Sequence, residues 1–260
     1  MRPADIILAM GIMSVPPTAT EYSFKEGDNH QGVWAIQRGL NSLNWLGYTL
    51  VEDGAFGPTT TQAVKQWQAA VSLASDGIFG PKSQARFLRS IVVRTEAGSA
   101  VPKGLVEGIC EGESGNYIAA VNSKVAGGTD CGYTQRRVYT PYEEAAVKRA
   151  FDSLYQVNLL VKTLVSRYKA YVVKSAVVKR DDTEEYAWRL ATLHHNWPYA
   201  ADRLANGYTL STQVANWVPD SAPDWAKTYR GWAKYYAMGS AQYDWPGLMT
   251  RQAFDVPADG

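Results

Sequence analysis

A hexapeptide that occurs twice near the amino terminus most constrains how this chain folds. Asp53-Gly-Ala-Phe-Gly-Pro58 recurs 23 residues later as Asp76-Gly-Ile-Phe-Gly-Pro81. In each copy Asp-Gly supplies a side-chain acceptor and a residue that tolerates positive φ. The proline suits the first position of a helix, where a missing N–H is harmless. The repeat predicts two similar turns, each followed by a helix, with Phe56 and Phe79 buried in the core.

Apolar residues at spacings of three and four supply the helices around these turns. The three stripes are Val33, Ile36, Leu40 and Leu43, then Ala63, Val64, Trp67 and Val71, then Ala85 and Leu88. They predict a unit of three helices over residues 27–92. A segment of residues 1–26 precedes it, and small and polar residues at 93–101 indicate a linker.

This segment resembles the type 1 peptidoglycan-binding domain. The resemblance rests on the two DG-x-FGP turns and on residues between and before them: Gly27, Val33, Ile36, Gln37, Leu40, Gly47, Tyr48, Ala63, Val64, Trp67 and Gln68. It implies noncovalent attachment to bacterial peptidoglycan. Most of the matching residues are structural, so the ligand contacts stay unassigned.

The second predicted domain, residues 102–260, begins with an apolar helix that leads into Glu113. Gly115 or Asn116 is the expected helix stop. A carboxylate on this last turn opposes the negative end of the helix dipole. That position favours the protonated acid, as general acid catalysis requires.

Two further blocks follow that helix. A glycine-rich stretch runs through Asp130 to Gly132-Tyr-Thr-Gln135, and a predicted helix ends at His194-His195-Asn196 before Pro198. With Glu113-Ser114-Gly115, their order resembles the lysozyme-like family of soluble lytic transglycosylases and goose-type lysozymes. The resemblance implies a mainly α chain, with a three-helix binding domain followed by a lysozyme-like helical domain.

The same resemblance implies the roles of the site residues. Glu113 becomes the catalytic acid/base, and the substrate-binding residues become Ser114, Tyr133, Gln135, His195 and Asn196. Three departures leave the sugar subsites open: Tyr133-Thr134 replaces Leu-Met, His195 replaces a tyrosine, and Trp197-Pro198 replaces small residues.

Asp130 is the leading second catalytic carboxylate. With such a group to position water the enzyme is a hydrolase; without one, the same glutamate can deprotonate the sugar 6-hydroxyl and form a 1,6-anhydro ring. An aspartate beside glycine also caps turns. The sequence therefore predicts cleavage between N-acetylmuramic acid and N-acetylglucosamine, but not which product forms.

Composition and charge exclude several other classes. A net charge of +1 gives no field to attract nucleic acid, and no apolar stretch is long enough to span a membrane. Adjacent His194 and His195 point about 100° apart on a helix and cannot share a zinc ion. We expect no metal and no cofactor, and a monomer whose partner is peptidoglycan. Cys110 and Cys131 pair or stay free; a cysteine peptidase would need one of them activated by histidine.

The amino terminus carries an apolar run at residues 6–15, within the length of a signal-peptide core. Its flanking charges cancel and no small-x-small cleavage site follows, so we expect a segment packed on the fold. The whole pattern is typical of a bacteriophage endolysin held in the host cytoplasm until release to the wall. The alternative is a non-catalytic wall-anchoring or virion structural protein with a degenerate lysozyme fold.

Overall fold

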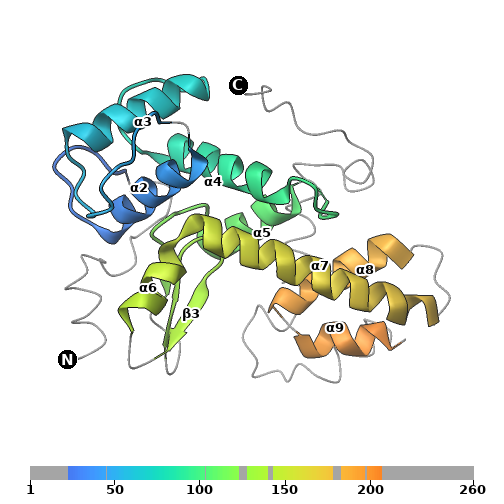
Figure 1. The fold of residues 1–260 in the computed structure, drawn as a ribbon. Helices are drawn as coiled ribbons and strands as arrows, with labels where there is room; N and C mark the ends of the chain where they lie inside the picture. The colour runs from blue at the N-terminus through green and yellow to red at the C-terminus, as the bar shows by residue number, and fades with distance from the viewer. Residues whose placement is uncertain are drawn as a thin grey trace. The chain divides into compact units, whose positions relative to one another are not determined.

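The computed structural model describes residues 23–44, 46–102, 104–122, 128–139, 143–177, 183–196 and 198–206. The helices are α2 (Gln31–Leu43), α3 (Pro58–Ala70), α4 (Pro81–Glu96), α5 (Leu105–Ser114), α6 (Glu144–Phe151), α7 (Ser153–Val177), α8 (Thr183–Asn196) and α9 (Pro198–Ala205). The strands are β1 (Val121–Asn122), β2 (Gly128–Cys131) and β3 (Arg136–Tyr139). The prediction of a mainly α chain is confirmed (Figure 1). None of the helices in these ranges has the length and apolar character that a membrane crossing needs.

Within the described ranges, the chain forms two compact units. The first contains residues 23–97 and 113–159, and the second contains residues 98–112 and 160–206. The division thus does not follow the predicted linker, and α4 itself continues to Glu96. The domain boundaries expected from the sequence remain a prediction.

The core of the first three helices follows the predicted stripes. Trp67, Phe79 and Phe87 form an aromatic cluster whose ring centroids lie 5.2–5.6 Å apart. Phe56 and Phe79 are both buried, as the repeated turn predicts. Ala85 is exposed, contrary to expectation. The buried stripe of α4 runs through Phe87 instead, and Ala85 lies off that face.

A buried glutamine clamps the first repeated turn. The Gln37 amide nitrogen donates to Asp53 Oδ1 (2.9 Å), the Ala55 carbonyl (3.1 Å) and Thr60 Oγ1 (3.1 Å). Its oxygen accepts from the Gly54 N–H at 2.9 Å. Because Gly54 has φ +79°, the turn needs the conformational freedom of glycine there.

The second turn repeats the same clamp. The Gln68 amide nitrogen donates to Asp76 Oδ1 (2.9 Å), the Ile78 carbonyl (2.9 Å) and Ser83 Oγ (3.1 Å), and its oxygen accepts from Gly77 N–H at 2.9 Å. The sequence repeat is therefore a repeat of a hydrogen-bond network, with a buried amide at each centre.

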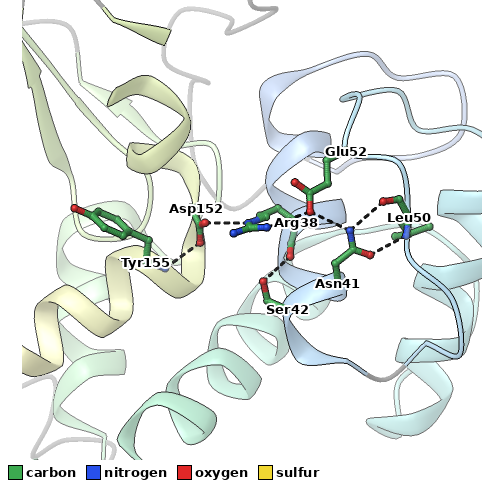
Figure 2. A network of polar contacts seen from close by, with 7 residues as sticks. All are labelled: Arg38, Asn41, Ser42, Leu50, Glu52, Asp152 and Tyr155. Atoms are coloured by element: carbon green, nitrogen blue, oxygen red, sulfur yellow. Dashed lines mark hydrogen bonds and ion pairs between the residues drawn. The ribbon is translucent and has the colours of Figure 1, made fainter. Parts of the chain in front are cut away.

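The segment that follows α5 packs on these helices. Phe24 stacks against Tyr117 with ring centroids 6.2 Å apart, and the Ile118 N–H donates to Gln84 Oε1 at 3.1 Å. Arg38 of α2 forms an ion pair with Asp152, the residue between α6 and α7 (Figure 2). Residues 113–159 and the three amino-terminal helices thus form one unit.

The small sheet is antiparallel, with strand order β1-β2-β3. Asp130 lies opposite Arg137, and Gly128 lies opposite Tyr139. Helix α6 packs against β2 and β3. In the second unit, Tyr168 of α7 stacks on Trp188 of α8 with centroids 4.1 Å apart.

Candidate functional site

Glu113 lies on the last turn of helix α5. The apolar face of this helix, with Leu105, Val106, Ile109 and Cys110, is buried. Gly115 (φ +62°) and Asn116 (φ +64°) then take the left-handed conformation, which ends the helix as the sequence predicts. Glu113 is half-buried and the neighbouring Ser114 is buried. A carboxyl group thus stands at the protein surface on a helix that is otherwise anchored by apolar residues.

Asp130 lies on strand β2 and is paired across the sheet with Arg137. Oδ1 accepts from Arg137 Nε, and Oδ2 accepts from Nη2 at 3.0 Å. This bidentate ion pair raises the pKa of Arg137, chiefly through the hydrogen bond to Asp130. Asp130 therefore has a cross-strand partner for both oxygens, a role that neither the turn-capping nor the catalytic interpretation anticipated.

The β2–β3 turn carries Gln135. Gln135 has φ +48°, and its side-chain nitrogen donates to the Gly132 carbonyl at 2.9 Å. The side chain is half-buried and folds back over its own turn. In this conformation the amide nitrogen of Gln135 stabilises the turn.

Gln156 of α7 holds that turn in place, and the sequence analysis missed it. Its oxygen accepts from the backbone N–H (2.8 Å) and hydroxyl (3.0 Å) of Thr134, and its nitrogen donates to the Ala150 carbonyl. A Cβ at Gly132 would collide with the Gln156 side chain and with the Ala150 carbonyl, so only glycine fits there. The available signal was a glutamine on the apolar stripe of α7, four residues before Leu160.

Tyr133 is fully buried, with 0% of its surface exposed. A ring in this position fills the core beneath the turn and offers no surface to a polysaccharide. The structure therefore gives Tyr133 a packing role, in place of the substrate contact expected from the resemblance.

His195 and Asn196 end α8 in the second unit. His195 is half-buried, whereas the side chain of Asn196 lies outside the described residues. His194 is buried, with Nδ1 2.8 Å from the Tyr171 hydroxyl. Burial, followed by the charge of Arg167, lowers the pKa of His194. The apolar run at residues 6–15 also lies outside the described ranges.

Cys110 and Cys131 are both buried and are not joined by a disulfide. Burial, together with the charge of Asp130, raises the pKa of Cys131 to about 12. A thiol with such a pKa is a poor nucleophile near neutral pH, because the thiolate is the reactive form.

The metal-ligating residue types do not gather in the described part of the chain. Across those residues, no group of three or more histidine, cysteine, aspartate or glutamate side chains has an arrangement that could hold a metal ion. His30 instead caps α2, where Nδ1 accepts from the Gly32 N–H at 2.9 Å.

The comparisons with known proteins concern the amino-terminal helices. Residues 29–86 match the peptidoglycan binding domain family, in agreement with the resemblance carried by the doubled turn. This match supports a peptidoglycan-associated protein.

A curated relative supports the same class. The chain is 39% identical over 59 residues to the zinc D-Ala-D-Ala carboxypeptidase of Streptomyces albus G. The alignment covers 23% of this chain and 23% of that enzyme. The chain thus spans less than a quarter of the relative's length.

Proposed function

We propose that this peptidoglycan-associated protein cleaves peptidoglycan glycan strands at the β-1,4 bond between N-acetylmuramic acid and N-acetylglucosamine. Glu113 is the general acid and base. The observation that carries the proposal is the position of Glu113: it is half-buried at the end of a helix with a buried apolar face, two residues before the chain turns toward the three-stranded sheet. Its unit also contains the amino-terminal helices.

The reaction begins with proton transfer from Glu113 to the glycosidic oxygen. The bond between C1 and that oxygen breaks, and positive charge develops on the sugar ring. The leaving sugar departs with a new 4-hydroxyl group.

The pairing of Asp130 with Arg137 favours the transglycosylase outcome. Both oxygens of Asp130 accept hydrogen bonds from Arg137, and we infer that this ion pair, rather than a water molecule, is what the carboxylate holds. In the proposed second step the 6-hydroxyl oxygen of the sugar attacks C1, and the Glu113 carboxylate accepts the hydroxyl proton. The product carries a 1,6-anhydro ring, and Glu113 returns to its protonated form.

Two other functions compete with this proposal. The name of the Streptomyces relative suggests peptidase activity as an alternative, but the alignment covers only 23% of that enzyme. A non-catalytic wall-anchoring protein would keep the binding helices and lack lytic activity. The combination of wall binding and glycan cleavage is typical of a bacteriophage endolysin, and we place the protein in that class as part of the proposal.

Mass spectrometry of fragments released from purified peptidoglycan tests the proposal. We expect fragments with anhydro ends. Fragments with reducing ends would make the enzyme a hydrolase, and cut peptides would overturn the glycosidase assignment. Intact peptidoglycan after incubation would favour the anchoring protein.

A further inference from the structure

A cavity of about 180 Å³ opens in the segment that matches the peptidoglycan-binding family, between the end of α2 and the loop that follows it. Its described lining residues are Leu40, Asn41, Asn44, Leu46, Gly47, Tyr48 and Thr49. We propose that this cavity, the α2-loop pocket, binds an N-acetylated sugar unit of the glycan strand. The proposal rests on the peptidoglycan association of residues 29–86, and it does not depend on the glycosidase activity.

The internal repeat shows that the connection containing these residues differs in length between the two copies. Gln37 and Asp53 are 16 residues apart in the first copy, whereas Gln68 and Asp76 are only 8 apart in the second. Both pairs make the same hydrogen bond at 2.9 Å. The first copy thus has a longer connection between these two residues, and the lining residues of the pocket lie within that connection.

Asn41 joins the end of this longer connection to helix α2. Asn41 donates from its amide nitrogen to the Leu50 carbonyl (3.0 Å) and to Glu52 Oε1 (3.0 Å), and its oxygen accepts from the Leu50 N–H at 2.8 Å (Figure 2). These contacts close the loop on α2. Asn41 is therefore a positioning residue, because its amide is already engaged by the loop.

Three other polar side chains remain available for a ligand. Within the described residues, the side chains of Asn44, Tyr48 and Thr49 make no hydrogen bond, and all three are exposed. Asn44 follows the last residue of α2 and takes the left-handed conformation (φ +56°). An amide and two hydroxyl groups together offer donors and acceptors to an acetamido group and sugar hydroxyls.

Tyr48 adds an aromatic surface to this polar set. It is 42% exposed, and Val51 on the same loop is 73% exposed. An exposed tyrosine ring suits stacking on the apolar face of a sugar and keeps its hydroxyl group for hydrogen bonding. Leu46, which is half-buried, contributes apolar surface to the same cavity.

The charge and size of the pocket favour a sugar over a peptide stem. Among the described lining residues none is charged. Peptide stems of peptidoglycan carry carboxylates, which proteins bind with arginine or lysine. The cavity is also smaller than the roughly 300–1,000 Å³ of pockets that enclose a drug-sized ligand. It fits one unit of a longer polymer.

Sedimentation with purified, insoluble peptidoglycan at 4 °C tests the pocket. The full chain carries Glu113→Gln throughout, so that the proposed lytic activity does not digest the wall. We expect Tyr48→Ala and Asn44→Ala each to weaken binding about tenfold, the loss of one well-placed contact. Ile78→Ala is the matched control, because Ile78 is also 42% exposed but lies in the second copy of the turn. It should bind within about twofold of the parent.

The outcomes separate the pocket from the broader assignments. If both pocket variants keep the parent's melting temperature and bind like the parent, the pocket is not the site, although wall binding stands. If the parent itself does not sediment, wall binding fails. Glycosidase activity is read separately by fragment analysis of the unmutated chain.

Competition with soluble probes tests the ligand class. We expect a tetramer of N-acetylglucosamine to release the parent chain from the wall, and a free peptide stem to leave it bound. Release by the peptide stem alone would overturn the assignment of a sugar ligand.

Discussion

Arg38 Nε lies 3.0 Å from Asp152 Oδ2, so an ion pair joins helix α2 to the start of α7 (Figure 2). Asp152 also accepts from the Tyr155 N–H at 2.9 Å, and so satisfies one of the free donors at the start of α7. The pKa of Arg38 is raised, chiefly by its hydrogen bond to Asp152. One carboxylate thus serves both as a helix cap and as an ion-pair partner.

The two roles of Asp152 are separable by mutation. Arg38→Met removes the ion pairs of Arg38 with Asp152 (3.0 Å) and Glu52 (3.5 Å) and leaves the helix cap in place. Because Arg38 is 44% exposed, we expect a loss of less than about 1 kcal/mol in the free energy of unfolding. Asp152→Ala also removes the cap and should cost about 1–2 kcal/mol. Urea denaturation of both variants measures the difference. Equal losses would mean that the cap contributes nothing measurable.

We expect the hydrogen-bond networks centred on Gln37 and Gln68 to contribute strongly to the stability of helices α2, α3 and α4. Gln68→Leu leaves the Gly77 N–H without its acceptor and removes three donated hydrogen bonds. Each orphaned buried group costs about 1–3 kcal/mol, so we expect a loss of at least about 2 kcal/mol. Gln37→Leu should cost a similar amount because its network is the same.

Gln66→Leu is the control for the clamp variants, since Gln66 is exposed on the same helix as Gln68. It should change the free energy of unfolding by less than about 0.5 kcal/mol. A destabilisation by Gln68→Leu no larger than that of the control would show that the network adds no net stability.

Because His30 is buried, we expect the folded protein to lose stability in acid. Burial lowers the pKa of His30, against a smaller opposing effect of Asp28. Because the folded pKa lies below the unfolded value of about 6.5, the unfolded state binds the proton more tightly. The contribution of His30 is therefore complete well above pH 6.5 and declines as the pH falls through that value.

A cap that does not titrate isolates this effect. In His30→Asn the amide oxygen can accept from the Gly32 N–H, and asparagine is a favoured cap residue. We expect the melting temperature of the variant to fall less between pH 7 and pH 5 than that of the unmutated chain. His194, whose pKa is also lowered by burial, is present in both proteins. Parallel curves would contradict the assignment to His30.

The sequence predicted the turns better than the network inside them. The repeated Asp-Gly and Phe-Gly-Pro pattern is local, so it identified both turns and the start of α3 and α4. Gln37 and Gln68 were visible as matching residues, but their direction depends on partners up to 23 residues away. Periodicity cannot show that a polar residue on a helix points inward.

The same contrast between local signals and distant contacts explains why only part of the candidate site was predicted. The end of α5 follows from Gly115 and Asn116, which are local signals. The burial of Tyr133 and the pairing of Asp130 with Arg137 depend on strand register and on Gln156 of a later helix. A tyrosine suits a core or a sugar surface equally well, and only the packing decides between them.

Glu113→Gln should abolish the release of glycan fragments while wall binding stays unchanged. Glutamine keeps the size of the side chain but cannot donate the proton to the glycosidic oxygen. Glu107→Gln, in the first turn of the same helix, is the matched control and should keep full activity. Turbidity clearing of purified walls measures the rate. A Glu113→Gln protein that clears walls at the unmutated rate would refute the assigned acid.

Asp130→Asn distinguishes the two reaction outcomes. If both oxygens stay bound to Arg137 during catalysis, Asp130 does not activate water, and the variant should lose less than about threefold in rate. A water-positioning carboxylate would instead cost at least about a hundredfold. Arg137→Gln is the complementary variant, because it releases the Asp130 carboxylate without removing it. Under the transglycosylase proposal it still yields anhydro ends, whereas a large loss in Asp130→Asn together with reducing ends in the unmutated enzyme would establish a hydrolase.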